Sequence, residues 1–275
     1  MITRNDPAVR RSAPPSWPTV ALARAALEVR VYFRSRDEMI FGFLYPTAMM
    51  LIFGSVFGGQ EVAPGVTYPQ YFLAGIAATG VMLTSFQAVG VGIAVERDAG
   101  DLARLRTTPM PPVAYFLGKA GLVLVTTIAQ LALLLTVAHL VYDIPLPNGS
   151  GWLTFAWVTV LGATAGTATG IWVSSLPRSG KSAGTVIPAI AVVLQFISGV
   201  FFVFSALPDW MQKVAAVFPL KWLTQGMRSV FLPESAAAAE VSGSWQHGLI
   251  ALVLLAWIVG ATLLALKTFR WRKAS

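Results

Sequence analysis

Uncharged, strongly apolar stretches of 18 residues or more predict helices that cross a membrane, and this chain contains six of them. They cover residues 40–58, 71–95, 120–142, 151–173, 183–204 and 248–266. Charged residues make up only 12% of the 275 positions, whereas a soluble domain carries about a quarter. Six such stretches argue strongly against the alternative, buried helices of a soluble protein. The sequence therefore predicts an all-α polytopic membrane protein with six transmembrane helices.

The Lys and Arg residues are divided unevenly between the two sides that six spans define. Of the 20, seven lie in 1–39, four in 96–119, two in 178–181 and four in 267–275, all on one side. Only three lie on the other side, in 205–245. Because cytoplasmic loops are rich in Lys and Arg, both termini are expected on the cytoplasmic side of a bacterial inner membrane. This bias and attraction to membrane lipid explain the net charge of +8, so nucleic-acid binding is not indicated.

The chain is expected to divide into three parts. Residues 1–18 contain four prolines and predict a flexible cytoplasmic leader, without the apolar run of a signal peptide. Residues 19–37 predict an amphipathic helix in the membrane interface, with a plain cytosolic helix as the alternative. Residues 38–275 form the six-span domain. The apolar stripe of the amphipathic helix consists of Leu22, Ala26, Val29 and Phe33.

The connection at 205–245 is too long for a turn, and half of it is apolar. Prolines divide it into two short helices, expected at about 209–217 and 220–231. Such helices suit elements that dip into the outer leaflet and return, because irregular backbone is tolerated there when it packs against protein. Re-entrant helices are therefore expected between spans five and six.

A compact charged loop, residues 96–119, separates the second and third apolar stretches. Gly100 is expected to precede a short helix that three prolines terminate. Leu102 and Leu105 are expected to share one exposed face of this helix, beside solvated arginines. A rigid helix with exposed leucines suits contact with a partner protein, and a plain solvated loop is the alternative.

Signatures of enzymatic or metal chemistry are weak. The stretch SLPRSGKS at 175–182 has Ser175 where a phosphate-binding loop needs its first glycine, so ATP binding is not expected. No cluster of His, Asp and Glu accompanies His139 or His247, and the absence of Cys excludes thiolate ligands. No catalytic constellation and no mid-span charge is visible, which disfavours an enzyme and an ion-coupled carrier.

Polar residues inside the spans have two interpretations. Hydrogen bonding between helices is the ordinary one, and lining of a substrate path is the alternative. The phenylalanines that end the fifth stretch fit core packing. In the fourth stretch, Gly162, Gly166 and Gly170 predict close helix contact, within the bundle rather than between subunits. Candidate path or gate residues are Thr84, Ser85, Gln87, Gln195, Phe196, Phe201, Phe202 and Phe204.

Two sequence blocks resemble the membrane subunit of type-2 ABC exporters, the permease family that includes bacterial drug-resistance exporters. The first block is Glu96-Arg97-Asp98, Gly100, Leu102, Leu105, Thr108-Pro109 and Gly118-Lys119. The second is SGVFFVFSALPDWMQ at 198–212, followed by FPLKWLTQGMR at 218–228. The resemblance covers nearly the whole chain, although Ala99 and Asp101 stand where many relatives have a second Glu and a Thr.

The resemblance implies a homodimer, or a pair with a second permease, assembled with two separate ABC ATPase subunits. Those subunits would bind ATP and Mg, so this chain would carry no cofactor and would not itself be an enzyme. The dimer interface would involve the first and fifth spans. The phenylalanines that end the fifth span would form an outer gate, with core packing as the equal alternative. A drug-like or lipid-like substrate would be exported; a polysaccharide or glycolipid substrate is the alternative. The implied ATPase-coupling residues are Glu96, Arg97, Asp98, Gly100, Asp101, Leu102, Leu105 and Arg106.

Overall fold

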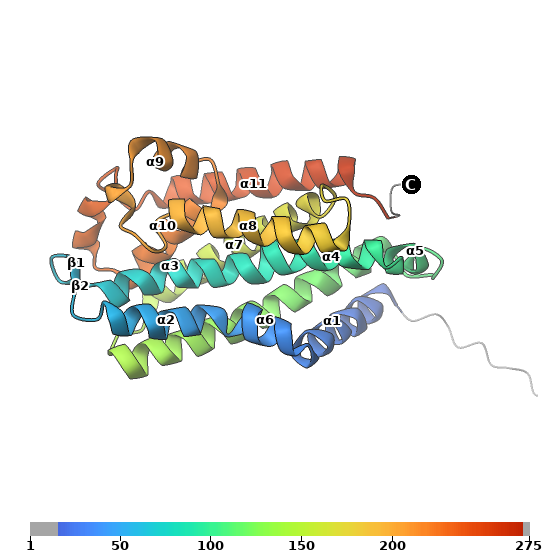
Figure 1. Cartoon of the computed structure of the whole chain (residues 1–275), viewed down its shortest axis with the longest axis horizontal. Helices are drawn as coiled ribbons and strands as arrows, with labels where there is room; N and C mark the ends of the chain where they lie inside the picture. Colours follow the sequence, from blue (N-terminus) through green and yellow to red (C-terminus); the bar gives the residue numbers. More distant parts are fainter. Residues whose placement is uncertain (1–15, 272–275) are drawn as a thin grey trace, which may run out of the picture.

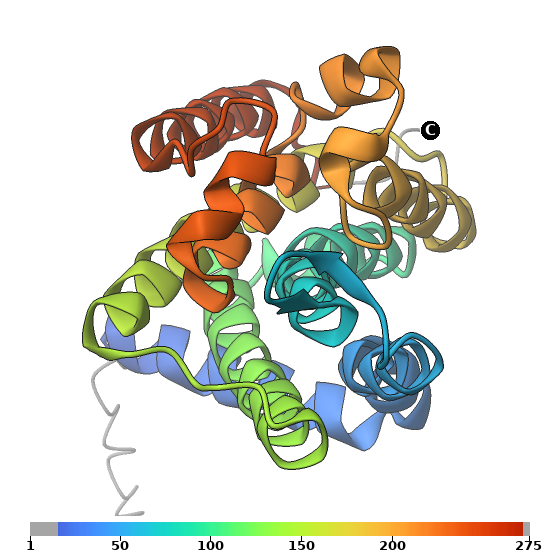
Figure 2. The same cartoon turned by 90° about the vertical axis from the view of Figure 1, so that its left-hand side faces the viewer.

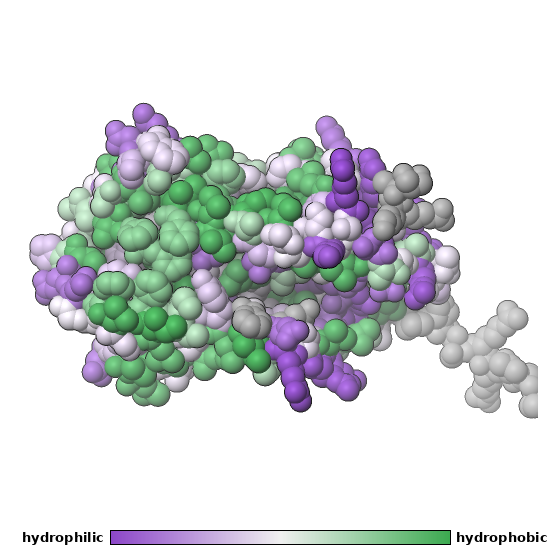
Figure 3. Space-filling view, in the orientation of Figure 1, coloured by the Kyte–Doolittle hydropathy of each residue, from purple (hydrophilic) through white to green (hydrophobic). Residues whose placement is uncertain are grey.

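The computed structural model describes residues 16–271, so most of the predicted leader lies outside the described residues (Figure 1). Within this range, five helical segments are long and apolar enough to cross a membrane. Hydrophobic side chains cover the middle of the molecule and hydrophilic ones gather at its ends (Figure 3). The predicted polytopic helical membrane protein is confirmed. The five segments are Tyr68–Asp98, α6 (Pro112–Tyr142), α7 (Gly149–Val173), α8 (Gly180–Ile197) and α11 (His247–Thr268).

The Tyr68–Asp98 segment runs through the middle of the bundle (Figure 2). Its apolar window is 89% buried, against at most 44% for the other four segments. This explains why it is apolar on all sides rather than along one stripe. It consists of α3 (Tyr68–Met82), the π-helical turn η2 (Leu83–Gln87) and α4 (Ala88–Asp98).

The first predicted span, 40–58, is divided into two helical pieces. A π-helical segment, η1 (Glu38–Phe43), precedes α2 (Tyr45–Val56). The 12 residues of α2 rise about 18 Å, which is less than the hydrocarbon core of about 30 Å. A sixth span therefore stays a prediction.

The predicted amphipathic helix is α1 (Trp17–Arg34), which packs obliquely on the first half of α6 (Figure 1). Gly118 of α6 gives it room, because a Cβ there would lie 2.5 Å from Arg24 Cγ. Most of the predicted apolar stripe faces away from the protein: Leu22 is 73% exposed, Phe33 is also exposed, and Val29 is half-buried. The helix is confirmed, whereas its place in a membrane interface stays a prediction.

Short elements form one end of the bundle, called the hairpin end (Figure 1). In the predicted turn before α3, β1 (Glu61–Ala63) pairs antiparallel with β2 (Val66–Thr67), so the described chain is not purely helical. The helix α8 stops at Ile197, and the predicted continuation to 204 is wrong, because Gly199 (φ 74°) turns the chain back. The elements that follow are η3 (Phe204–Ala206), α9 (Asp209–Ala215), α10 (Pro219–Phe231) and η4 (Glu234–Ala239).

The glycine strip of α7 packs inside this chain, as predicted. A Cβ at Gly162 would collide with a Leu223 methyl carbon of α10, and one at Gly166 would collide with Ser85 Oγ. At Gly170 it would lie 2.7 Å from the Phe86 carbonyl oxygen. Because glycine has no side chain, the backbone of α7 can pack directly against the backbone of the central helix.

Replacing Gly170 by Val is expected to lower the free energy of unfolding by about 1–3 kcal/mol, because the added atoms meet backbone that cannot rotate away. Gly260→Val is the matched control, since an added Cβ on this α11 residue meets nothing within 4 Å. The unfolding temperatures of both variants in detergent measure the difference. Equal temperatures would show that the α7 contact is looser than described.

Candidate functional site

The charged loop predicted to contact a partner forms an ordered corner at the end opposite the hairpin, called the α5 end (Figure 1). After α4, Gly100 adopts a left-handed backbone (φ 81°) and redirects the chain into α5 (Asp101–Leu105). Glycine adopts this conformation without steric cost. Two threonine hydroxyls then donate hydrogen bonds back to carbonyl oxygens of α5.

One leucine of α5 points into the protein. Leu102 has no exposed surface and packs with Val89, Ile93 and Tyr115, while Leu105 is half-buried against the same cluster. The expectation of two exposed leucines is therefore wrong. A helix of five residues is too short to be stable alone, so an apolar anchor in the core fixes its direction.

The outward surface of α5 is charged. Asp101, Arg104 and Arg106 are exposed, and Asp101 lies 3.5 Å from Arg104. Exposed ion pairs of this kind contribute at most about 1 kcal/mol. These side chains can therefore exchange their partners at little cost, and they are called the α5 surface below.

A buried charge cluster joins α1, α4 and α6 near the α5 end. Lys119, only 4% exposed, donates hydrogen bonds to Glu28 Oε2 (2.9 Å) and to Glu96 Oε1 (2.6 Å). The Tyr115 hydroxyl donates to the other oxygen of Glu96 (2.6 Å), and Arg24 pairs with Glu28. Two cations thus balance two carboxylates, as a buried cluster requires.

The next two residues of α4 bind other parts of the chain. Arg97 donates hydrogen bonds to the carbonyl oxygen of Ser174 after α7 (2.6 Å) and to that of Arg270 after α11 (2.7 Å). Asp98 accepts one from the backbone N–H of Gly180, at the positive end of the α8 dipole (3.2 Å). Successive residues of a helix point about 100° apart, so the run from 96 to 98 connects α4 to neighbours on several sides.

The predicted coupling residues therefore fall into two groups. Glu96, Arg97, Asp98 and Leu102 contact their own chain, whereas the charges of the α5 surface face outward. Sequence reasoning missed Glu28, although a signal was available: it is the only acidic residue between Asp6 and Asp37. One partner of an ion pair is then the lone carboxylate among the arginines, and the other is the lysine at the start of an uncharged span.

The predicted path residues lie in the packing between helices of this chain. The Thr84 hydroxyl lies 2.8 Å from that of Thr127, and the Ser85 hydroxyl donates to the Val81 carbonyl, so both take part in buried packing of this chain. Gln195 is buried beside the Tyr45 hydroxyl of α2. Gln87 is only half-buried, on the central helix. A role of these residues in transport stays a prediction.

The predicted aromatic gate is divided between core and surface. Phe201 is buried and lies 5.5 Å from Phe53 and 5.9 Å from Phe72, measured between ring centres. Phe196 and Phe202 are exposed. The remaining member, Phe204, is buried, and its ring centre lies 5.2 Å from Lys221 Nζ of α10.

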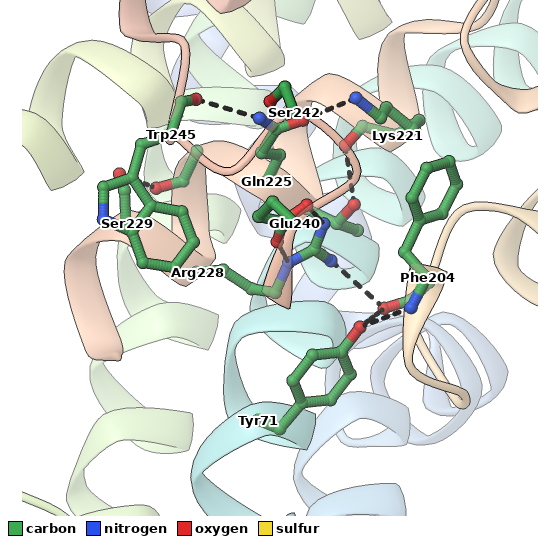
Figure 4. A network of polar contacts seen from close by, with 12 residues as sticks. Tyr71, Phe204, Lys221, Gln225, Arg228, Ser229, Glu240, Ser242 and Trp245 are labelled. Carbon is green, nitrogen blue, oxygen red and sulfur yellow. Dashed lines mark hydrogen bonds and ion pairs between the residues drawn. The ribbon is translucent and has the colours of Figure 1, made fainter. Parts of the chain in front are cut away.

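A second buried ion pair lies at the hairpin end, in the region predicted to form re-entrant helices (Figure 4). Arg228 of α10 is fully buried and donates two hydrogen bonds to Glu240, one to each carboxylate oxygen. A third donor nitrogen of Arg228 lies 3.4 Å from the Gly199 carbonyl oxygen. Tyr71 of α3 accepts a hydrogen bond from the Phe204 backbone N–H (3.1 Å). This network holds the turn after α8 against α3 and α10.

An apolar groove of about 810 Å³ opens between α6, α7 and α11. Phe116, Leu124, Ala163, Ile171 and Leu266 are among its walls. The described residues contain no group of three His, Cys, Asp or Glu side chains placed to hold a metal ion. The arrangement is thus one of apolar surfaces and structural charge clusters.

Residues 21–232 match the ABC-2 type transporter family. Over 173 residues the chain is 23% identical to the probable multidrug ABC transporter permease YbhR of Escherichia coli strain K12, covering 63% of this chain and 45% of YbhR. Over 192 residues it is 21% identical to YvfS of Bacillus subtilis strain 168, named as a transport permease, covering 70% and 77%. The chain thus spans less than half the length of YbhR.

Proposed function

Because this chain belongs to the ABC-2 type transporter family, we propose that it is the permease of an ATP-driven exporter for a hydrophobic or amphipathic molecule. Separate ATPase subunits bind ATP and Mg, and this chain provides the membrane path. The observation that carries the proposal is the charged, ordered α5 at one end of an apolar helix bundle. The apolar walls of the groove between α6, α7 and α11 support a drug-like or lipid-like substrate.

In this proposal the ATPase docks on the α5 surface. Leu102 anchors α5 in the core, so displacement of α5 must also move the base of α4. The buried charge cluster then transmits the displacement to α1 and α6, while Arg97 and Asp98 transmit it to the ends of α7 and α8. Because buried ion pairs are costly to break, these contacts make the helix ends at the α5 end move together as one rigid unit.

The same proposal places the α5 end in the cytoplasm of a bacterial cell, because most Lys and Arg residues lie on that side of the six predicted spans. Figure 1 shows η1 and α2 running from the middle of the bundle to the hairpin end. We assign these two pieces to the sixth crossing, which brings both described ends of the chain to one side.

A cysteine replacing Ser242 in this cysteine-free chain would then react with an impermeant thiol reagent in intact cells, unlike one replacing Ser179.

A homodimer, or a pair with a second permease, is proposed to form along α2 and α8, which lie on the same side of the central helix (Figure 2). Both helices expose large apolar side chains. Those of α2 include Leu51, Ile52 and Val56, and those of α8 include Val186, Ile190 and Val193. An interface there would include the exposed Phe196 at the end of α8.

Reversing two charges of the α5 surface, Arg104→Glu with Arg106→Glu, is expected to reduce the ATPase that co-purifies with the tagged permease by at least about tenfold. In this proposal the two arginines pair with carboxylates of the ATPase, and their reversal places like charges opposite each other, which costs several kcal/mol. Mg-ATPase activity per permease, measured after purification from native membranes, gives the result. Lys213→Glu, an exposed substitution at the hairpin end, is the control and should change nothing. Unchanged ATPase recovery with the double variant would exclude α5 as the docking site.

A further inference from the structure

We propose that the hairpin end carries a binding site for an organic anion with an apolar or aromatic body. In this site the Lys221 ammonium group donates hydrogen bonds to the anionic oxygen atoms. The site is a pocket of about 420 Å³ between α9, α10 and the segment that follows η4. This volume suits a drug-sized ligand. The pocket lies at the other end of the bundle from α5, so the proposal does not depend on ATPase docking.

Lys221 is a buried cation that forms no ion pair with any carboxylate in the part of the chain described. It is 6% exposed, and its Nζ donates a hydrogen bond to Gln225 Oε1. The centre of the Trp222 ring lies 3.6 Å from this nitrogen. An ammonium group has three donors, so Lys221 can serve a ligand while it keeps Gln225. Buried charges are normally paired, and an anion in the pocket provides that pairing.

The other charges of the pocket do not neutralise Lys221. Both carboxylate oxygens of Glu240 are engaged by Arg228 (Figure 4). Asp209 and Lys213 of α9 are exposed at the rim and carry opposite charges. The interior therefore keeps one uncompensated positive charge, which favours an anion over a neutral molecule of the same shape.

The geometry around Lys221 also favours a ligand with two unlike ends. Lys221 is the third residue of α10, whose N-cap residue Phe218 makes no side-chain cap, so the positive end of the helix dipole adds to the lysine charge. Phe204, Trp222 and Leu249 line the same pocket with apolar surface. A ligand with a carboxylate or phosphate group beside Lys221 and an apolar body against these walls would fit both the charged and the apolar part of the pocket.

The charge of Lys221 is sensitive to pH in the physiological range. Burial lowers the pKa of Lys221 to about 8, although the Glu240 carboxylate opposes this shift and Arg228 adds to it. Asp209 and Lys213 are the remaining charged groups around the pocket. Below pH 8 the ammonium form predominates and binds an anion, whereas above pH 8 it is lost. Affinity for an anion should therefore fall about tenfold between pH 7 and pH 9.

The test uses the full chain in nanodiscs of phosphatidylcholine and compares 2-naphthoate with its neutral isostere 2-naphthamide by calorimetry. Naphthoate is expected to bind at least tenfold more tightly at pH 7 and to take up protons when it binds at pH 8, measured in two buffers of different ionisation enthalpy. Lys221→Met should abolish this preference, Lys221→Arg should keep most of it, and Lys181→Met, an exposed position outside the pocket, should leave it unchanged.

A second arm identifies the natural source of the anion. Nanodiscs with phosphatidylglycerol should weaken naphthoate binding if the site accepts a lipid headgroup, and they should leave it unchanged if the ligand is a free amphiphile; either result supports the site. Equal binding of naphthoate and naphthamide to the wild-type protein, or naphthoate binding to Lys221→Met at wild-type affinity, would overturn the proposal. Neither result depends on ATPase recovery, so this proposal can fail while the exporter proposal stands.

Discussion

Replacing Lys119 by Met is expected to destabilise the permease by about 3–5 kcal/mol, because removal of one partner from a buried ion cluster leaves uncompensated charge behind. Without Lys119, Glu28 and Glu96 would keep only Arg24 as a cation, and Glu96 lies 3.5 Å from that guanidinium. The thermal unfolding temperature in detergent and the yield of monodisperse protein measure the loss.

Two further variants separate charge from packing in this cluster. Lys119→Met combined with Glu96→Gln should recover much of the stability, because Arg24 and Glu28 then remain as a balanced ion pair. Lys181→Met, at an exposed position at the start of α8, is the matched control and should unfold like the wild type. If Lys119→Met alone also unfolds like the wild type, the cluster does not hold α1, α4 and α6 together.

Replacing Leu102 by Asp is expected to disrupt the fold of the α5 end rather than only the contact with the ATPase. The side chain is fully buried, and loss of a buried Leu costs about 2–5 kcal/mol, to which burial of a carboxylate adds its desolvation. Loss of unfolding temperature, measured with the permease alone, distinguishes this effect from a docking defect.

Leu105→Asp provides the comparison within the same helix. Leu105 is only half-buried, so its replacement should cost the isolated permease less stability while still placing a carboxylate next to the α5 surface. A Leu102→Asp permease that unfolds at the wild-type temperature but loses its ATPase would restore the interpretation that Leu102 is a docking residue. Assembly defects in Leu102 variants therefore require a stability measurement before they are assigned to the interface.

The sequence by itself determined the class of protein and most helix positions. The long uncharged stretches predict membrane spans because lipid leaves no partner for exposed backbone groups. Prolines predicted the ends of α9 and α10 to within two residues of their observed positions, because proline cannot continue a preceding helix. Gly100 and the prolines after it defined α5 for the same local reasons. The two blocks around residues 96–119 and 198–228 pointed to the family that the match over 21–232 shows.

Only the tertiary structure decided which side chains meet. Nothing local distinguishes Leu102, which is buried, from Leu105, or shows that Glu96 contacts Lys119 of α6 and Glu28 lies opposite it in α1. Charge along the chain likewise could not show that Arg228 and Glu240 form a buried pair while Lys221 stays without one. The end of α8 at Ile197 depends on this packing too, because the apolar residues after it fold back against α3 and α10. Helix periodicity reports the average surroundings of a segment, whereas pairing depends on which segments the fold places side by side.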